Sequence, residues 1–347
     1  MKKIVKTNEF FVAITVVALC LFIGIRNPVF FTGANAVSLL KNSVVDGIMA
    51  FALMLGIIAG GIDVSFPAIA VCSFYLTNKL MQTIDFQGSV VLPILMAVAI
   101  GTVLGFINGV IIAKYNLPAF IVTLGTSSVF HGLLISLVGS RQIGRLQPPL
   151  EEMSKASLFT VQSDNAVSSM PVTFIFLVVI AIVVHIILKY TMLGRGIYAV
   201  GGDRVSAERA GFPVKGIQVF VYTFIGMAAG LAGIVHSIQA RMAIPTDLMG
   251  NEMLIIAAVV LGGTNISGGS GTVIGTALGL ALITITKNSL ILIGIPSTAQ
   301  RFVLGLIIVA GTAVSAYQAL RNSRKNPKIL ADTDTPVKDV EGGAANV

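Results

Sequence analysis

The chain has 347 residues, of which 55% are hydrophobic and only 11% are charged, and its formal net charge is +8. Soluble domains carry about 25% charged residues, so this composition excludes an ordinary water-soluble globular protein. A strongly basic soluble protein would suggest a nucleic acid partner. In a membrane protein, lysine and arginine gather instead on the cytoplasmic side. We therefore expect an α-helical integral membrane protein that lies in the lipid bilayer and binds no nucleic acid.

Long apolar stretches recur from Phe10 to Ala319. A helix of about 20 mostly apolar residues crosses a bilayer. The sequence predicts an all-α integral membrane bundle of about ten transmembrane helices (roughly eight to ten), some of them interrupted by glycine, over residues 1–320. The eighth predicted span is short for a full crossing and suggests half of a broken helix. The expected spans are 9–26, 43–60, 66–82, 89–113, 118–138, 171–189, 217–237, 251–262, 271–292 and 300–320.

The amino terminus resembles a signal peptide, with Met1-Lys2-Lys3 before an apolar run, but no small-residue cleavage site follows. We interpret it as a first span that is retained. Basic residues gather before the first span, after the sixth and after the last. If those segments are cytoplasmic, both termini lie inside a bacterial plasma (inner) membrane, and the polar segment 139–170 is an external loop. The tail 321–347 loses hydrophobicity and is expected to be a disordered cytoplasmic segment.

One six-residue pattern occurs twice. Gly60-Gly61-Ile62-Asp63-Val64-Ser65 matches Gly262-Gly263-Thr264-Asn265-Ile266-Ser267, and each copy lies between two apolar runs. Paired helices interrupted by glycine are typical of a transporter's midplane site, and non-helical backbone at membrane depth is tolerated where it lines a cavity or is buried in protein. Asp63, Ser65, Asn265 and Ser267 are therefore candidate residues of a substrate pathway.

The alternative is that both copies are tight cytoplasmic turns in which Asp63 and Asn265 cap the following helix. If the chain has ten spans, the two copies of the pattern cross the membrane in the same direction. An inverted duplication would require a different number of spans. The repeated pattern covers only six residues, so it is weak support for an internal duplication of the chain.

Glycines spaced by four form two further ladders, Gly101-Gly105-Gly109 and Gly271-Gly275-Gly279. Small residues at this spacing share one helix face and allow close helix packing. Asn108 lies beside the first ladder, and Lys287-Asn288 follow the second. These polar residues either line the pathway or form hydrogen bonds between helices, and Asn108 is included among the candidate pathway residues.

The predicted cytoplasmic segment 191–216 is charged and contains a short helical stretch at Ser206–Ala210, which Gly211 can terminate. A membrane subunit needs a structured element of this kind to dock an ATPase. Arg204, Ala207, Glu208 and Gly211 are the candidate coupling residues. The alternative is an ordinary amphipathic connector on the membrane surface.

Several chemistries find no support in the sequence. No Gly-Lys pair occurs, so a Walker A loop is absent, and no His-Glu-x-x-His motif occurs either. We therefore expect a transport subunit rather than an enzyme, with no cofactor of its own. Ile266–Ser270 is superficially similar to an ABC ATPase signature but lies in an apolar context. Gly268–Gly271 is similar to an intramembrane serine protease motif, yet no histidine follows Ser270 as a base. Cys20 and Cys72 lie in apolar runs and predict inert thiols.

Four stretches together resemble the permease subunits of ribose/galactose/xylose-type ABC importers, which include autoinducer-2 permeases. They are Gly60–Ser65, Leu117–Gly125, Gly196–Gly211 and Ala257–Thr272, and the likeness extends from about residue 35 to 320. The resemblance implies a dimer with a second permease copy or a paralogue. It also implies a cytoplasmic ABC ATPase that binds ATP, an extracytoplasmic sugar-binding protein, and a coupling role for 191–216.

Two departures from that family's pattern lie near the implied pathway. Phe66-Pro67 stands where the family usually continues with Val-Gly, and Leu254 stands where it usually has an acidic residue. They leave the transport class intact and the solute open. The implied function is import of a sugar or sugar-like solute. The alternatives are an ion-coupled secondary transporter, for which Asp46, Asp63 and Glu252 would be the intramembrane carboxylates, and a structural or regulatory subunit without a pathway.

Overall fold

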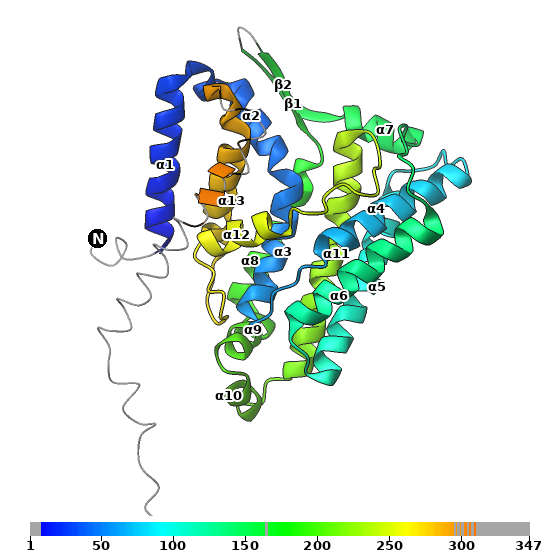
Figure 1. The fold of residues 1–347 in the computed structure, drawn as a ribbon, viewed down its shortest axis with the longest axis vertical. Coiled ribbons are helices and arrows are strands. Elements are labelled where there is room, and N and C mark those ends of the chain that lie inside the picture. The colour runs from blue at the N-terminus through cyan, green and yellow to red at the C-terminus, as the bar shows by residue number, and fades with distance from the viewer. Residues whose placement is uncertain are drawn as a thin grey trace, which may run out of the picture.

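The computed structural model describes residues 8–163 and 166–294, together with 296, 299, 302–303, 305–306 and 309. Helices dominate it (Figure 1). A β-hairpin projects from one end of the helix bundle, and two short helices, α9 and α10, lie at the opposite end. These are called the hairpin end and the α10 end below.

The elements follow one another with few long connections. The first part of the chain forms α1 (Asn8–Arg26), η2 (Pro28–Phe31), α2 (Gly33–Asn42), α3 (Val44–Ile58), α4 (Phe66–Thr83), α5 (Val91–Tyr115), α6 (Ala119–Leu133) and η3 (Leu134–Val138). The second part forms α7 (Pro148–Lys155), β1 (Ser157–Ser163), β2 (Ala166–Pro171), α8 (Phe174–Tyr190), α9 (Met192–Gly202), α10 (Arg204–Arg209), α11 (Val214–Ala240), α12 (Glu252–Leu261), α13 (Val273–Ser289) and η4 (Ile291–Ile293).

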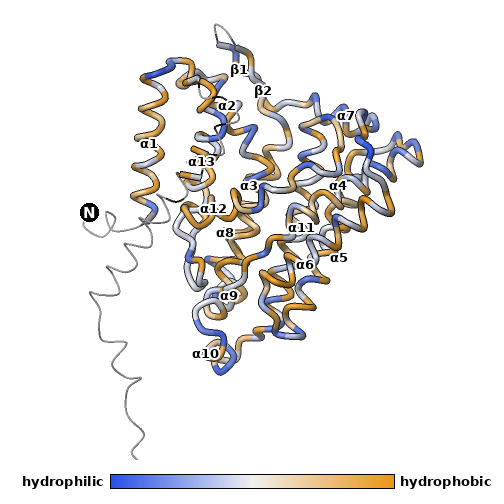
Figure 2. Tube along the Cα trace, viewed as in Figure 1, coloured by the Kyte–Doolittle hydropathy of each residue, from blue (hydrophilic) through white to orange (hydrophobic). Residues whose placement is uncertain are grey.

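Four of the described helices are long and apolar enough to cross a membrane, namely α1, α5, α6 continued through η3, and α11. Two bent pairs, α2–α3 at 49° and α8–α9 at 77°, bring the number to six if each pair is one span, and α12 and α13 are shorter apolar helices. Hydrophobic residues cover most of the helices, while hydrophilic residues concentrate around α10 and at the hairpin end (Figure 2). The predicted all-α integral membrane bundle is confirmed.

The described spans agree with the prediction to within a few residues, with one exception. The second span begins earlier than expected, because α2 precedes α3 and is bent away from it. The eighth span is α12, a helix of 10 residues, so the expected short helix is present. Most of the predicted span 300–320, and the whole tail 321–347, lie outside the described residues.

The segment 139–170 was expected to be a loop, but it contains α7 and most of the β-hairpin. β1 and β2 pair antiparallel from Ser157↔Pro171 to Ser163↔Ala166. The hairpin lies against α2, where Ser38 Oγ is 3.1 Å from Ser168 Oγ. Its first strand is short and largely exposed, so it lacks the strict apolar alternation by which a half-buried strand is identified in a sequence.

α3 forms the centre of the bundle. Every residue of α3 except Asp46 is buried, and the helix packs against α8, α11, α12 and α13. A helix that is hydrophobic on all sides is either buried in protein or surrounded by lipid. Here the protein itself covers α3, whereas α1 and one side of α5 and α6 expose large apolar side chains, as expected for helices that face lipid or another membrane subunit.

The first glycine ladder brings the backbones of α5 and α11 into contact. A Cβ atom built at Gly105 would lie 2.4 Å from the carbonyl oxygen of Tyr222, and one at Gly226 would lie 2.3 Å from the carbonyl oxygen of Gly101. The second ladder does the same for α13 on α12, since a Cβ at Gly275 would lie 2.1 Å from the carbonyl oxygen of Gly262. Both ladders therefore serve close helix packing.

We predict that Gly226→Ala destabilises the protein by about 1–3 kcal/mol, because the added methyl group meets backbone atoms on α5 that no rotamer change can move. Gly216→Ala is the matched control on the same helix, where the nearest atom would be Pro213 Cβ at 3.8 Å. Alanine forms helices better than glycine by about 1 kcal/mol, so the control should be neutral or stabilising. Thermal unfolding in detergent measures both, and equal midpoints for the two variants would contradict the packing described.

Candidate functional site: two glycine breaks and two polar cavities

The two Gly-Gly motifs end their helices with the same hydrogen-bond pattern. At the end of α3, the amides of Gly60 and Gly61 donate to the carbonyls of Ile57 and Gly56, at 3.0 and 2.9 Å. At the end of α12, the amides of Gly263 and Thr264 donate in the same way to Val260 and Val259. This is the Schellman cap, which needs a residue with positive φ. Gly60 supplies it with φ +83° and Gly263 with φ +93°.

The polar residue of each motif then forms the same local turn. Asp63 Oδ1 accepts a hydrogen bond from the amide of Ser65 at 2.7 Å, and Asn265 Oδ1 accepts one from the amide of Ser267 at 3.1 Å. The alternative of tight turns holds for the backbone of both motifs, but the expected helix cap at Asn265 is wrong, because Thr272 caps α13. Each motif is a tight turn, and each turn also interrupts two apolar segments within the bundle.

The first break is locked in the interior. Asp63 and Ser65 are fully buried, and Ser65 Oγ donates to Asp63 Oδ1 at 2.6 Å. Asn108 of α5 donates to Ser65 Oγ at 2.8 Å, and Thr123 Oγ1 of α6 accepts a hydrogen bond from the amide of Val64 at 3.1 Å. The structure thus brings three of the predicted pathway residues, Asp63, Ser65 and Asn108, into one network.

That network has spare acceptors. Asp63 Oδ2 and Asn108 Oδ1 are buried and have no hydrogen-bond partner among the residues that the structure describes. An unpartnered polar atom in a dry interior costs free energy, and such groups mark sites where another donor binds. Hydroxyl groups of a solute or of water would satisfy both atoms.

The second break lies elsewhere. Asn265 and Ser267 are exposed at the α10 end and take no part in the network of Asp63. Sequence similarity between the two motifs therefore does not place their polar side chains in one site. The backbone following the second motif reaches the first break instead, because the amide of Gly269 donates to the carbonyl of Ile58 at 2.9 Å.

α9 touches both breaks at this point. A Cβ at Gly201 would lie 1.7 Å from the carbonyl oxygen of Ile58 and 2.7 Å from the amide nitrogen of Gly269. A Cβ at Gly268 would lie 2.5 Å from the carbonyl oxygen of Gly201 and 3.0 Å from the Cα of Gly60. The hydroxyl of Tyr198 on α9 donates to the carbonyl of Gly271 at 2.8 Å. We call this meeting of Gly60, Gly201 and Gly268–Gly269 the glycine junction.

α10 follows α9 and carries the residues predicted to couple. Arg204 begins the helix and its guanidinium donates to Asn116 Oδ1 in the turn between α5 and α6. Ala207 is buried, Glu208 is exposed, and Gly211 follows the helix with φ +87°. The predicted short helix with its glycine end is present.

Asp203 caps α10. Its side chain accepts hydrogen bonds from the amides of Val205 and Ser206 and from Ser206 Oγ. The hydrogen bonds from Ser206 hold the pKa of Asp203 below its usual value. The cap is therefore complete at neutral pH and is lost only as the pH falls through that lowered pKa.

One polar cavity opens at the α10 end. It has a volume of about 350 Å³ and lies between the first break, the turn from α5 to α6, the end of α9 and the start of α11. Its polar lining comes from Asn116, Arg204, Gln218, Tyr222 and Ser267. Gly60 and Gly61 form one wall, so this cavity lies beside the network of Asp63.

A second polar cavity of about 360 Å³ opens at the hairpin end, between α2, α3, α11, the segment before α12, and α13. Lys287 Nζ is 3.5 Å from Asp46 Oδ2, and Asn42 Nδ2 donates to Asn288 Oδ1 at 2.8 Å. The other polar residues of its lining are His236, Gln239, Asp247, Asn251 and Thr284.

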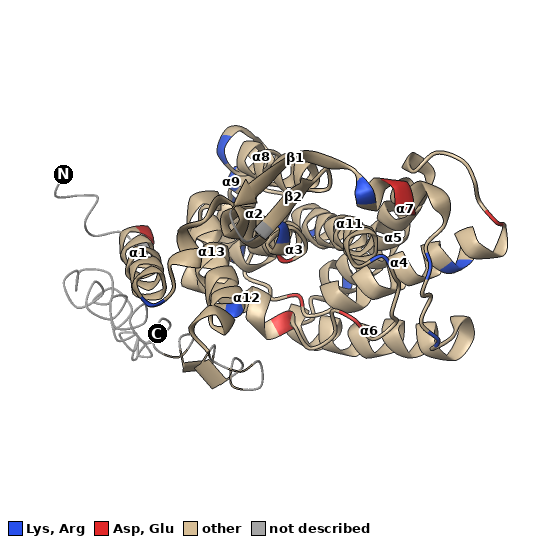
Figure 3. Cartoon of the chain, turned by 90° about the horizontal axis from the view of Figure 1, so that it is seen from above, with Lys and Arg blue, Asp and Glu red and all other residues tan. Residues whose placement is uncertain are grey.

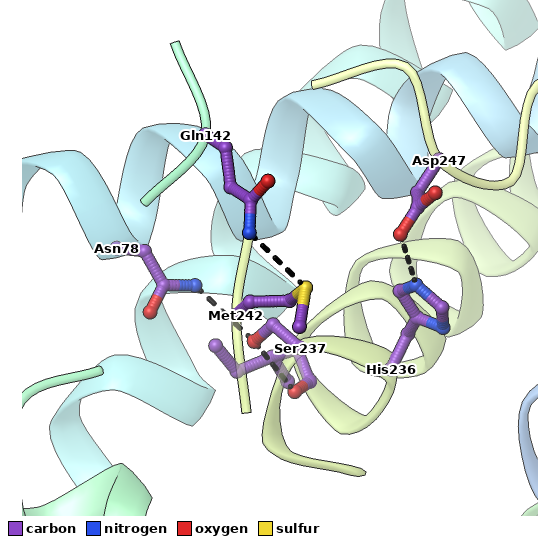
Figure 4. A network of polar contacts seen from close by, with 7 residues as sticks. Asn78, Gln142, His236, Ser237, Met242 and Asp247 are labelled. Carbon is purple, nitrogen blue, oxygen red and sulfur yellow. Dashed lines mark hydrogen bonds and ion pairs between the residues drawn. The ribbon is translucent and has the colours of Figure 1, made fainter. Parts of the chain in front are cut away.

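His236 Nε2 lies 3.1 Å from Asp247 Oδ2 and ties the segment before α12 to α11 (Figure 4). The same view shows two neighbouring ties, from Asn78 to Ser237 and from Gln142 to Met242. Of these contacts, the one between His236 and Asp247 joins two residues that line the hairpin-end cavity. In the view from above, charged residues occupy few positions along the chain (Figure 3).

A buried apolar layer separates the two cavities. Gln218 and His236 lie 18 residues apart on α11, a rise of about 27 Å in an α-helix. The residues between them pack with α3 and α12 in one hydrophobic cluster. Two polar cavities at opposite ends of an apolar helical bundle, with buried apolar residues between them, suit a helical membrane permease.

The comparison with known families gives the same class. The family described as branched-chain amino acid transport system/permease component matches residues 35–311. The chain belongs to this permease family.

Relatives with curated names cover most of the chain. The ribose import permease protein RbsC of Haemophilus influenzae is 32% identical over 304 residues, 88% of this chain and 92% of the relative. The protein of the same name from Bacillus subtilis is 33% identical over 292 residues, 84% and 87% of the two chains. The D-allose transport system permease protein AlsC of Escherichia coli is 30% identical over 314 residues, 89% and 91%. No solved structure matches.

The sequence pointed to part of this site. Lys287-Asn288 was singled out beside the second ladder and does line the hairpin-end cavity. Asn42, His236 and Asp247 were missed as a group, because each is a single polar residue on a different segment and only the fold brings them together. Among the described residues, no group of three or more histidine, cysteine or acidic side chains is placed to hold a metal ion.

We predict that Gly201→Ala opens the glycine junction, because its methyl group would occupy the space of the carbonyl of Ile58. Amide hydrogen exchange of Gly269 and of the segment 55–65 should then accelerate at least tenfold. Gly202→Ala is the matched control, since a Cβ at Gly202 has no atom within 4 Å. Unchanged exchange in Gly201→Ala, or equal changes in both variants, would show that the junction is not a tight contact.

Proposed function

We propose that this chain is the membrane-spanning subunit of an ABC importer that moves a sugar or sugar-like solute into the cytoplasm. A separate ABC ATPase supplies the energy, and an extracytoplasmic binding protein delivers the solute. In this assignment the protein is a multi-pass component of the bacterial inner membrane. The α10 end and both termini face the cytoplasm, and the chain pairs with a second permease copy or a paralogue.

The pair of polar cavities with a closed apolar layer between them is the observation that carries the proposal. A solute can occupy either cavity, and movement of helices between them would expose it to one side at a time. Rocking of two permease copies about the breaks supplies such movement. The three relatives described above are named for ribose or allose, so a sugar is the class favoured here.

The hairpin-end cavity suits a polyol better than a branched-chain amino acid, the solute class in the family description. Its lining carries carboxylates, amides and a hydroxyl, which both donate to and accept from solute hydroxyl groups. A branched aliphatic side chain would need an apolar pocket, whereas only Val45 and Leu248 are apolar among the lining residues.

The segment 191–216 is proposed to receive the ATPase. α10 is a short helix that Asp203 caps, and its residue Glu208 is exposed. α9 precedes α10 and ends at the glycine junction. A displacement of α10 would therefore move both breaks through contacts between backbone atoms. Unlike side chains, these atoms cannot absorb the movement by a change of rotamer. Arg204 extends the contact to the turn between α5 and α6.

The test of this proposal is reconstituted uptake. The purified chain, its ATPase and a binding protein in liposomes should accumulate labelled ribose or allose only when ATP is present on the side of the ATPase. Liposomes with the chain alone and an imposed proton or sodium gradient should not accumulate solute. Accumulation under a gradient alone would replace the proposal with an ion-coupled secondary transporter.

We predict that Asp46→Asn raises the solute concentration for half-maximal uptake about tenfold or more, because a hydrogen bond to a charged group contributes about 1.5–3 kcal/mol. The basal rate of ATP hydrolysis should be unchanged, since Asp46 lies at the end opposite the ATPase. Asp85→Asn is the control, an exposed carboxylate outside the cavity. If Asp46→Asn matches this control, Asp46 has no part in solute recognition.

A further inference from the structure

A third cavity of about 250 Å³ lies beneath the base of the β-hairpin. It is enclosed by the end of α2, the end of α7, both strands, the start of α8 and the end of α11. Three cationic side chains line it, from Lys41, Lys155 and Arg241, and hydroxyl groups of Ser157, Ser169 and Thr173 lie among them. The lining contains no aspartate or glutamate.

Only one of the three cationic side chains has an acidic partner among the described residues. Lys155 Nζ lies 2.9 Å from Glu151 Oε1 on α7, and this contact holds the pKa of Glu151 below its usual value. Lys41 and Arg241 make no ion pair or side-chain hydrogen bond within the part of the chain that the structure describes. Cations and hydroxyl donors gathered in one cavity without an acid favour an anionic occupant.

The third cavity adjoins the hairpin-end cavity. Gln239 lines both, and its Nε2 donates to Thr173 Oγ1 at 2.9 Å, so this side chain forms the partition. Lys41 and Asn42, consecutive residues at the end of α2, line one cavity each. Whatever binds in the third cavity is therefore held directly beside the proposed solute entrance.

We infer that this cavity is a socket for a carboxylate side chain of the extracytoplasmic binding protein. The inference rests on the proposed function. A protein that delivers a solute must be held with its own opening over the hairpin-end cavity, and an ion pair beside that opening fixes the register of the two proteins. Arg241 presents a planar guanidinium that pairs with a carboxylate through two parallel hydrogen bonds, and Lys41 adds a point charge.

The neighbouring hairpin supports this occupant over a free anion. Leu158, Phe159 and Val167 expose apolar side chains on its strands, at 45%, 50% and 65% of their surface. An exposed apolar surface beside a charged socket is typical of a protein interface, in which apolar contacts supply area and charges set orientation. A free anion would use the socket and leave the hairpin uncovered.

The experiment uses the permease–ATPase complex in lipid nanodiscs and the solute-binding protein that activates the wild-type complex. Lys41→Glu and Arg241→Glu should each raise the binding-protein concentration for half-maximal stimulation of ATP hydrolysis at least tenfold. Basal hydrolysis should remain unchanged. Lys41→Arg and Arg241→Lys should stay within about threefold of wild type, and the salt dependence of stimulation should weaken in the charge-reversed variants.

Lys79→Glu is the matched control, an exposed lysine near the hairpin-side end of α4 and outside the socket. If both socket reversals behave like Lys79→Glu, the socket does not hold the binding protein. A second arm titrates acetate against chloride at constant ionic strength. Saturable acetate binding that Arg241→Glu abolishes, with stimulation by the binding protein intact, would assign the socket to a free anion instead.

The control for the underlying assignment is separate. A wild-type complex that no binding protein stimulates would contradict the proposed function itself, before any socket variant is compared. Normal stimulation of wild type, with no effect of either reversal, contradicts the socket alone.

Discussion

Backbone amides and carbonyls inside a bilayer must find partners within the protein, because hydrocarbon offers none. α3 and α12 nevertheless end among the packed helices of the bundle. Schellman caps at Gly60 and Gly263 pair the last carbonyls of both helices, and the turns at Asp63 and Asn265 pair the amides that follow. The rest of the structure depends on this solution. It allows two chain breaks in the bundle, and the first of them, at Gly60 and Gly61, forms one wall of the α10-end cavity.

The glycine content follows from the same constraint and from the lack of a hydrophobic driving force between helices in lipid. Gly105 and Gly226 bring α5 and α11 into backbone contact, and Gly275 brings α13 onto α12. Gly201 differs from these, because it brings the end of α9 against the end of α3 and the segment after the second motif. Periodicity identifies the ladders, since their spacing of four places them on one face. Gly201 belongs to no such pattern, and its role appears only when the three segments meet in space.

Much of the fold could be predicted from the sequence, because long apolar runs indicate helices that cross the membrane and basic segments indicate cytoplasmic loops. The expected position of the short span at 251–262 and of the helix ending before Gly211 both agree with the structure. The hairpin was not accessible, since Ser157–Ser163 is short and exposed, and neither was α9, whose glycines hide its helical pattern. Within the site, Asp63, Ser65 and Asn108 were found through the repeated motif and the first ladder. The pairs Asp46–Lys287 and His236–Asp247 join residues more than ten positions apart on separate segments, and no local pattern marks them.

Burial distinguishes the two copies of the repeated motif. Asp63 is fully buried beside unpartnered acceptors, whereas Asn265 is exposed at the α10 end. A carboxylate is tolerated in the interior only where its hydrogen bonds or a ligand offset the loss of water. The second copy forms no hydrogen bond with the side chain of Asp63. The amide of Gly269, which follows the second copy, donates to the carbonyl of Ile58, the last residue of the helix that leads to Asp63. This hydrogen bond joins the segment after the second motif to the end of that helix. The two copies of the motif are therefore linked through backbone atoms, although their polar side chains lie in different surroundings.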